Sequence, residues 1–449
     1  MARCIFRWEA RTLLSLRPSS SQANVPFLWP FKRVFYGWGI VSVSMLVTFA
    51  HAPMYGPMLA IFVKPIGDDL GWSRTTIALA FTIGSFSGSM LSGLVGGLFD
   101  RYGGRGIIAL SGMVVAGAML GLAVMTDPWH FWALIGVGRG VAIAGINLGT
   151  SVMIAKWFIR MRGRAMAIGG SGVRIGQAAL PFLAHAIIVT QGWRSAYVVL
   201  AVLTALLITI PALVYMRRKP EDLGLLPDGD DPNADPNDAR MEGRRQLRLE
   251  EAWTLKEAIR EPSLWLIVQV MAAGAFALTA VNLHLTASFQ DRGISAVLAV
   301  TVTAIYTGVS AVSMIVWGFA IERIHARHLT MVVSLIYIVS MVVMLQADTF
   351  PVALAFVLMF GVATGGWTVL HNVLIADYFG RHSVGAIRGF TMPFMGIINP
   401  LGPLLAGWLR DTQGDYNMAF IIFIGVFVLM FVSMLLAVPP RRKVTPETA

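Results

Sequence analysis

Long hydrophobic stretches alternate with short polar segments from Gly37 to Val438. Each stretch stays apolar for about 20 residues, the length that an α-helix needs to cross about 30 Å of hydrocarbon. A strand of a transmembrane β-barrel would instead alternate polar and apolar residues over about ten positions. We therefore predict an all-α membrane protein with twelve transmembrane helices. Their approximate limits are 37–63, 75–99, 106–126, 129–155, 164–189, 194–216, 263–289, 295–321, 329–347, 350–377, 385–409 and 416–438.

The composition supports this interpretation. Hydrophobic residues make up 56% and charged residues 13% of the 449-residue chain, whereas about 25% of residues are charged in a typical soluble domain. This balance excludes a cytosolic enzyme, a secreted domain and a disordered chain. The single cysteine, Cys4, excludes an intramolecular disulfide and a cysteine-based metal cluster. Because no P-loop and no hydrolase or metalloenzyme motif occurs, we expect neither an enzyme nor a cofactor.

The distribution of Lys and Arg predicts the orientation in the membrane. If the N-terminus is cytoplasmic, 28 of the 35 basic residues fall in inner segments and 5 in outer ones. Arg381 and Arg388 are counted as the inner pair between spans ten and eleven, and the nine in the long central segment carry less weight. The bias predicts an inner-membrane protein with both termini cytoplasmic. The net charge of +11 then reflects inner loops that face anionic lipid, and not nucleic acid.

The spans divide into two groups of six around a long polar segment. We predict a cytoplasmic N-terminal segment, a six-helix lobe, a cytoplasmic central loop, a second six-helix lobe and a cytoplasmic tail, at 1–36, 37–216, 217–262, 263–438 and 439–449. Within the central loop, Pro227–Asp238 is acidic and Pro-rich, which predicts disorder, and Thr254–Arg260 predicts a short surface helix. The segment 1–30 is either a helix on the lipid surface or an upstream mis-start.

An internal repeat relates the two halves at a constant offset of 222. Agreement at one offset in three separated segments indicates a duplicated six-helix unit, and parallel repeats of this kind hold a substrate between the halves. The matches are Gly96, Asp100, Arg101 and Arg105 with Gly318, Glu322, Arg323 and Arg327, Pro181 with Pro403, and 190–192 with 412–414.

The segment Gly96–Arg105, between spans two and three, resembles the loop signature of the major facilitator superfamily, G-x-L-x-D-R-x-G-x-R. Within that family, Tyr36-Gly37-Trp38, 70–74 and 192–194 look like the branch of monocarboxylate and oxalate/formate transporters. The resemblance implies a two-lobe transporter that works by alternating access. The chain departs from that branch because span eight has no basic residue before Glu322, and spans one and eleven lack the central Lys.

The resemblance also implies a latch at the inner end. Asp100 would pair with basic groups and with the N-terminal dipole of a helix in the other lobe, and so hold one conformation. The gating residues expected on this basis are Asp100, Arg101, Arg105, Glu322 and Arg323. The alternative is an ordinary positively charged inner loop.

Two arginines inside the membrane are the main candidates for chemistry. Arg139 in span four and Arg174 in span five each lie about ten residues from a span end, near the midplane. An intramembrane Arg normally has a partner, yet no Asp or Glu occurs from Pro128 to Met216. Two cations without a carboxylate indicate an anionic substrate. Alternatively, carbonyls and waters satisfy both, or Arg139 is the conformational Arg that many family members carry on span four.

Polar side chains in other cavity-facing spans are further candidates for substrate contact, although hydrogen bonding between helices explains each of them equally well. They are His51, Tyr55, Asn282, His284, Tyr306, His371, Asn372 and Asn399. Asn399-Pro400 and Gly402-Pro403 also predict a break in span eleven.

These observations predict secondary active transport of a small organic anion such as a monocarboxylate. The partners expected are the anionic substrate, a proton or counter-anion, and membrane lipids. Since no span interior holds an Asp or Glu, a proton must travel on the substrate or on His51, His284 or His371, unless the protein exchanges anions. The alternatives are an efflux carrier for apolar compounds and, more remotely, a transporter-like membrane sensor.

Overall fold

The computed structural model describes residues 34–72, 74–230 and 253–440, and every regular element in those ranges is a helix. The first half holds α2 (Gly37–Ala50), α3 (Gly56–Leu70), α4 (Arg74–Tyr102), α5 (Gly104–Ala123), α6 (Pro128–Val141), the π-turn η3 (Ala142–Asn147), α7 (Leu148–Trp157), α8 (Arg162–Thr204), the π-turn η4 (Ala205–Thr209) and α9 (Ile210–Tyr215). The second half holds α12 (Pro262–Asp291), α13 (Ala296–Ile321), α14 (Ala326–Met344), α15 (Phe350–Phe379), α16 (Val384–Ile398), α17 (Leu401–Gln413) and α18 (Asn417–Leu436).

The twelve predicted spans are found, although the helices do not match them one to one. Ten helical stretches of the described chain are long and apolar enough to cross a membrane, and one of them, Arg162–Tyr215, has 54 residues. A straight helix of that length would measure about 81 Å. It is two passes, because the backbone leaves helical geometry at Gly192, with φ 85° and ψ 166°. The first pass is α2 and α3, joined by the 3₁₀ turn η2 (Ala52–Met54).

Span eleven is broken where the sequence predicted. α16 ends at Ile398 and α17 begins at Leu401, so Asn399 and Pro400 form the break. Pro cannot donate a backbone hydrogen bond and clashes with the preceding turn. The break separates the inner half of the span from the outer half.

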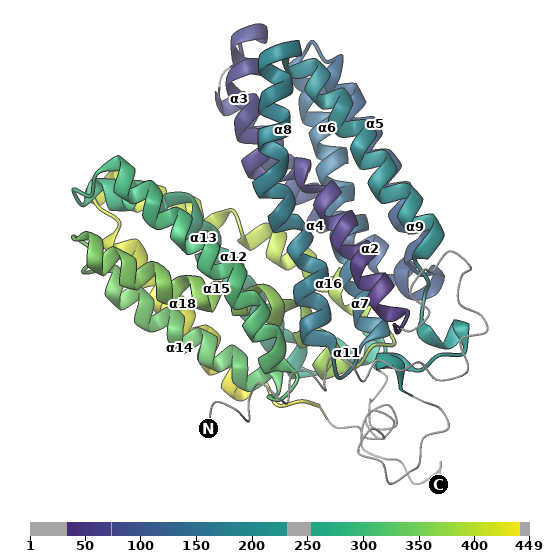
Figure 1. The fold of residues 1–449 in the computed structure, drawn as a ribbon. Coiled ribbons are helices and arrows are strands. Elements are labelled where there is room, and N and C mark those ends of the chain that lie inside the picture. Colours follow the sequence, from purple (N-terminus) through teal and green to yellow (C-terminus); the bar gives the residue numbers. More distant parts are fainter. Residues whose placement is uncertain (1–33, 73, 231–252, 441–449) are drawn as a thin grey trace, which may run out of the picture.

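The helices form two bundles that meet at one end and diverge at the other (Figure 1). The bundles meet where α7, α11 (Leu255–Ala258) and α16 lie, and they are farthest apart beyond α3 and α13. Glycines make the close approach possible. A Cβ built on Gly96 of α4 would lie 2.2 Å from the carbonyl oxygen of Gly385 on α16, so only a residue without a side chain fits.

A second pair of glycines makes the same kind of contact between α8 and α13. A Cβ on Gly163 of α8 would lie 2.3 Å from the carbonyl oxygen of Gly318 on α13. Gly96 and Gly318 are equivalent positions of the repeat, and so are Gly163 and Gly385. The interface between the lobes therefore repeats the internal duplication of the sequence. We call these two glycine pairs the inner seam, and the end of the molecule where they lie the inner end, because the sequence predicts that this end faces the cytoplasm.

The beginning of the central loop is ordered, so the prediction of disorder is wrong for Pro227–Asp230. Asp228 is buried, with 7% of its surface exposed. Its carboxylate accepts hydrogen bonds from the backbone N–H groups of Ile159, Arg160 and Met161 at 3.1, 2.9 and 3.0 Å. These N–H groups precede the first turn of α8, where backbone donors lack partners within the helix. The rest of the predicted disordered segment lies outside the described residues.

The helix predicted at 254–260 is shorter than expected, since α11 covers only Leu255–Ala258. The side chains of Thr254 and Glu257 cap its N-terminus reciprocally. The predictions for the segment 1–30 fall on a part of the chain that the structure does not describe.

Candidate functional site

Arg174 lies on α8, in the first lobe. Its side chain is exposed, and it interacts electrostatically with the hydroxyl groups of Tyr55 in the first lobe and Tyr306 in the second. Among the described residues no ion-pair partner of Arg174 is found. An exposed guanidinium whose charge acts on tyrosines of both lobes, and which has no carboxylate partner in the described part of the chain, is suited to an anion.

Tyr55 sits at the break in the first span, as the N-cap of α3, with an extended backbone. Its hydroxyl accepts a hydrogen bond from the Nδ2 of Asn147 at 3.0 Å. The ring of His51 packs edge-on against the Tyr55 ring at 5.3 Å between centroids. His51 is 1% exposed, and its Nε2 has no hydrogen-bond partner in the described part of the chain. The predicted pair His51 and Tyr55 therefore lies together, and the guanidinium carbon of Arg139 lies 5.5 Å from the centre of the Tyr55 ring.

Arg139 is held by protein groups. Its side chain is 7% exposed, and it donates hydrogen bonds to the Met54 carbonyl and, at 3.0 Å, to the Ser85 hydroxyl. The guanidinium carbon lies 3.6 Å from the centre of the Phe81 ring, which adds a cation–π contact. These contacts tie α6 to α4 and to the turn before Tyr55. They match the alternative in which carbonyls satisfy Arg139.

The second lobe contributes Tyr306 and Asn282. Tyr306 is buried on α13, and its hydroxyl donates a hydrogen bond to the Thr364 hydroxyl of α15 at 3.5 Å. The exposed Asn282 of α12 donates to the Leu278 carbonyl oxygen at 2.8 Å, within its own helix. Asn399, at the break in span eleven, accepts a hydrogen bond from Thr279 of α12. In the second lobe, Tyr306 is the described group on which the charge of Arg174 is shown to act.

His284 points elsewhere. Its Nδ1 lies 3.2 Å from the Tyr416 hydroxyl, and its Nε2 lies 3.1 Å from the Pro403 carbonyl oxygen. Both contacts are made within the second lobe, between α12, α17 and the start of α18. His284 therefore joins helices of one lobe, as the alternative of hydrogen bonding between helices expects.

His371 and Asn372 lie near a third arginine, Arg388. Arg388 is 1% exposed on α16, and its Nη2 donates to the Asn372 Oδ1 at 2.6 Å. Its Nε and Nη1 are buried without a hydrogen-bond partner among the described residues. The charge of Arg388 acts on the ring of His371. The Nδ1 of His371 lies 2.9 Å from the Trp367 carbonyl oxygen. The assignment of Arg388 to an inner loop is wrong, because the residue lies inside span eleven.

The inner end is closed by charged groups beside the seam. The Asp100 carboxylate pairs with Lys156 at 2.9 Å and accepts hydrogen bonds from the backbone N–H groups of Gly385 and Ala386 at 3.3 and 2.7 Å. Glu322 pairs with Arg164 at 2.8 Å. Burial raises the pKa of the Glu322 carboxyl above its ordinary value, and Arg164 offsets only part of this rise.

The remaining predicted gating residues lie at the periphery of this cluster. Arg101 and Arg323 are exposed, and Arg101 lies over the ring of the neighbouring Tyr102 at 5.2 Å. Arg105 is exposed near Tyr36. Two basic residues that the sequence places in a loop are part of the closure instead. Lys156 lies in the last turn of α7, and Arg162, the first residue of α8, lies 3.7 Å from Asp377 of α15.

Comparison with known proteins decides the family. The model of the Major Facilitator Superfamily matches residues 38–398 and 266–449. The chain belongs to this superfamily. Monocarboxylate transporter 12 of Rattus norvegicus is 23% identical over 89% of this chain and 85% of its own length. Monocarboxylate transporter 13 of the same species is 24% identical over 90% of this chain and 89% of its own length. This superfamily member thus resembles the monocarboxylate branch.

Other relatives of this Major Facilitator Superfamily protein differ in the cargo that their names give. A probable L-galactonate transporter of Escherichia coli K12 is 25% identical over 81% of each chain. The solved structure of the proton:xylose symporter XylE superposes with a TM-score of 0.70, at 16% identity, over 90% of this chain and 96% of its own. The human organic anion transporter MFSD10 gives a TM-score of 0.65 at 16% identity, over 89% of this chain and 99% of its own. At these identities the structures establish the fold alone.

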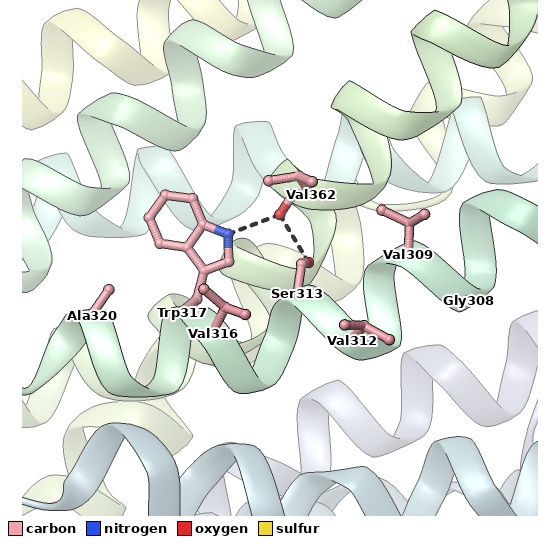
Figure 2. Close-up of a pocket in the computed structure, with 8 residues that line it drawn as sticks. All are labelled: Gly308, Val309, Val312, Ser313, Val316, Trp317, Ala320 and Val362. Atoms are coloured by element: carbon pink, nitrogen blue, oxygen red, sulfur yellow. Dashed lines mark hydrogen bonds between the residues drawn. The ribbon is translucent and has the colours of Figure 1, made fainter. Parts of the chain in front are cut away.

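A separate apolar pocket lies on the second lobe of this superfamily protein, between α13 and α15 (Figure 2). Its volume is about 640 Å³, and the Nε1 of Trp317 donates to the Val362 carbonyl oxygen at 3.0 Å along its wall. The residues that line it are Gly308, Val309, Val312, Ser313, Val316, Trp317, Ala320 and Val362. None of the predicted site residues is among them, and the lining offers an anion no charge.

Proposed function

We propose that this Major Facilitator Superfamily protein is a secondary active transporter of a small organic anion, most simply a monocarboxylate. The observation that supports the proposal is the position of Arg174, an exposed guanidinium that interacts with Tyr55 of one lobe and Tyr306 of the other. A carboxylate bound to Arg174 would accept further hydrogen bonds from these hydroxyls. It would therefore draw both lobes toward the same ligand.

The relatives support an anionic cargo. The names of the curated relatives refer to monocarboxylates and to L-galactonate. In this chain Arg174, near the midplane, replaces the cations that the branch carries on spans one, eight and eleven. Arg139 contributes in this proposal by fixing the turn that presents Tyr55, since its guanidinium donates to the carbonyl of Met54.

The proposed cycle begins with the inner end closed and the outer end open. With the N-terminus and C-terminus cytoplasmic in the inner membrane, the end closed by the Gly96 and Gly385 pair faces the cytoplasm. Anion binding between the lobes closes the outer end, and the inner seam then parts to release the anion. A reporter fused after Ala449 tests the orientation, because activity of that reporter only in the periplasm would overturn it.

Coupling is proposed to involve the substrate or a histidine. No described span interior has an Asp or Glu beside Arg174, so a proton has no carboxylate carrier there. His51 is a carrier of suitable type, because its Nε2 has no hydrogen-bond partner among the described residues and its ring contacts Tyr55. Anion exchange without a proton is the other form of the proposal. Uptake into proteoliposomes with and without a pH gradient distinguishes the two.

The decisive experiment measures binding by purified protein. A panel of labelled acids, namely acetate, pyruvate, lactate and benzoate, is titrated against the wild-type chain and three variants. Arg174→Gln should abolish binding, and Arg174→Lys should weaken it about tenfold, because an ammonium replaces a planar fork that holds a carboxylate with two hydrogen bonds. Arg260→Gln removes an exposed inner charge and serves as the matched control. Unchanged affinity in Arg174→Gln would overturn the proposal, and binding of apolar compounds alone would favour an efflux carrier.

A further inference from the structure

Arg388 is a buried cation whose hydrogen bonds are incomplete. It is 1% exposed, and among the described residues its guanidinium has a single hydrogen-bond partner, the Oδ1 of Asn372. Nε and Nη1 have none. A buried charge without a counter-charge is destabilising, and buried donors without acceptors add to that penalty. Such a residue would be stabilised by a partner that binds during the transport cycle.

The geometry of the guanidinium defines the kind of partner. Nη2 carries two hydrogens, one on the edge that it shares with Nε and one on the edge that it shares with Nη1. Asn372 takes one of them, at 2.6 Å. Neither Nε nor Nη1 has an acceptor among the described residues. The second hydrogen of Nη2 therefore lies parallel to an N–H of Nε or of Nη1, and this edge of the guanidinium presents two parallel donors. Two parallel N–H groups match the two oxygens of a carboxylate.

The acids near the inner end are already engaged. Asp100 pairs with Lys156 and accepts two backbone hydrogen bonds from the start of α16. Asp377 lies 3.7 Å from Arg162 and accepts a hydrogen bond from the backbone N–H of Ala326. The described side chains therefore offer Arg388 no carboxylate, and a small anion such as the substrate would supply one.

Arg388 lies closer to the inner end than Arg174. α8 and α16 are equivalent helices of the repeat, because their first residues, Arg162 and Val384, are equivalent positions. Arg174 is twelve residues into α8, and Arg388 is four residues into α16. At about 1.5 Å per residue, Arg388 is about 12 Å nearer the inner end. It also adjoins Gly389, where a Cβ would lie 2.4 Å from the Ser92 carbonyl oxygen on α4.

We propose that Arg388 is a second carboxylate-binding position, which takes the transported anion from Arg174 when the inner seam opens and holds it before release. This inference rests on the proposed function, since it requires an anionic substrate. Opening the seam separates α4 from α16 beside Arg388 and gives the open edge access to the substrate.

The test compares anion affinity with the seam closed and open. Gly96→Leu forces the seam apart, because even a Cβ at this position would meet the Gly385 carbonyl oxygen at 2.2 Å. Spin labels at Tyr102→Cys and Ile324→Cys, with Cys4→Ser, report the opening, since both positions are exposed at the inner end, one on each lobe. We call this the inner label pair. The probe is the acid of the panel, acetate, pyruvate, lactate or benzoate, that the wild-type chain binds.

In the Gly96→Leu background, Arg388→Gln should raise the Kd about tenfold, and Arg388→Lys should raise it less. In the closed wild-type background, Arg174→Gln should abolish binding while Arg388→Gln changes the Kd less than about twofold. Arg260→Gln is the matched control for the loss of an inner charge in both backgrounds. An equal Kd for Arg388 and Arg388→Gln in the open background overturns this inference and leaves the central site intact. Failure of the wild-type chain to bind any acid overturns the proposed function instead.

A second measurement does not depend on Gly96→Leu. In inside-out vesicles the otherwise wild-type chain meets substrate from the inner face. Arg388→Gln should raise the KM at this face about tenfold while the outer-face KM, measured in right-side-out vesicles, stays within about twofold. Equal changes at both faces, or none, would mean that Arg388 is a structural residue.

Discussion

The carboxylate of Asp100 and the backbone N–H of Ala386 meet at 2.7 Å across the two lobes. Asp100 belongs to the end of α4, and Ala386 to the first turn of α16, where free N–H groups and the helix dipole attract an anion. Glu322 makes the corresponding contact with the backbone N–H of Arg164 in the first turn of α8. Asp100 and Glu322 are equivalent positions of the repeat, and so are Arg164 and Ala386. Each lobe therefore caps a helix of the other with an acid.

Removing the charge of Asp100 should impair transport without unfolding the protein. Asp100→Asn keeps the size of the side chain but loses the ion pair with Lys156 and weakens the cap on α16. We expect the rate of uptake to fall at least about tenfold while the melting temperature stays within a few degrees, because the contact belongs to one state of the cycle. Asp222→Asn, an exposed acid of the central loop, is the control. Full transport by Asp100→Asn would contradict the latch.

The inner seam should be sensitive to single methyl groups. Gly96→Ala places a Cβ within 2.2 Å of the Gly385 carbonyl oxygen, so α4 and α16 must move apart. Gly97→Ala is an ideal control, since a Cβ there meets nothing within 4 Å. We expect a longer distance between the inner label pair in Gly96→Ala and an unchanged distance in Gly97→Ala. Gly163→Ala should reproduce the effect through its clash with Gly318, and a wild-type distance in both seam variants would contradict this role.

Much of this architecture can be predicted from the sequence because it depends on length, polarity and repetition. Twelve apolar stretches follow from the thickness of a bilayer, and Asn399-Pro400 breaks span eleven because proline cannot continue a helix. The constant offset between the two halves predicts that they are equivalent, and the glycine pairs of the inner seam obey it. These features depend on short stretches of sequence, or on pairs of positions that the internal repeat makes equivalent.

The partners of charged residues could not be predicted in the same way. Arg388 and Lys156 look like loop cations in a sequence, because a basic residue near a span end normally faces lipid headgroups. Their burial depends on the packing of α16 and α7 against the opposite lobe. The position of Arg388 three residues inside the predicted limit of span eleven was the signal available. Likewise, only tertiary structure separates the exposed Arg174 from the buried Arg139.

Arg139 should affect stability before it affects affinity. Arg139→Gln removes the hydrogen bonds to Met54 and Ser85 and the contact with Phe81. Hydrogen bonds to a charged group contribute about 1.5–3 kcal/mol each, but the neutral Gln no longer carries the cost of a buried charge, which offsets part of the loss. We therefore expect a net loss of stability of about 2 kcal/mol and a melting temperature lower by several degrees. Thermal unfolding of purified protein measures this. Arg174→Gln is the matched comparison, because an exposed Arg should leave the melting temperature unchanged, and equal melting temperatures for both variants would contradict the distinction.

Acidification should favour the closed inner end, and Glu322 should be responsible. Burial raises the pKa of this carboxyl above the value that it has in water, and the charge of Arg164 compensates only in part. When the seam opens, the carboxyl becomes hydrated and its pKa returns toward the ordinary value. The closed state therefore binds a proton more tightly than the open state, and by linkage a lower pH stabilises the closed state. Protonation of Glu322 also breaks its ion pair with Arg164, and this effect alone would favour the open state at low pH.

The measurement is the distance distribution of the inner label pair between pH 8 and pH 5.5. We expect the ratio of closed to open molecules to rise on acidification, by no more than about tenfold for each unit by which burial raises the pKa. Glu322→Gln mimics the protonated acid, so this variant should be closed at both pH values. Arg160, Arg164 and Asp228 face Glu322, and the exposed His325 and His328 lie nearby on the chain, but all five remain in the variant. Any pH dependence that they cause persists in Glu322→Gln, so the difference between the two proteins isolates Glu322. Opening of the wild-type protein at pH 5.5, absent from Glu322→Gln, would show that the ion pair with Arg164 outweighs the penalty of burial.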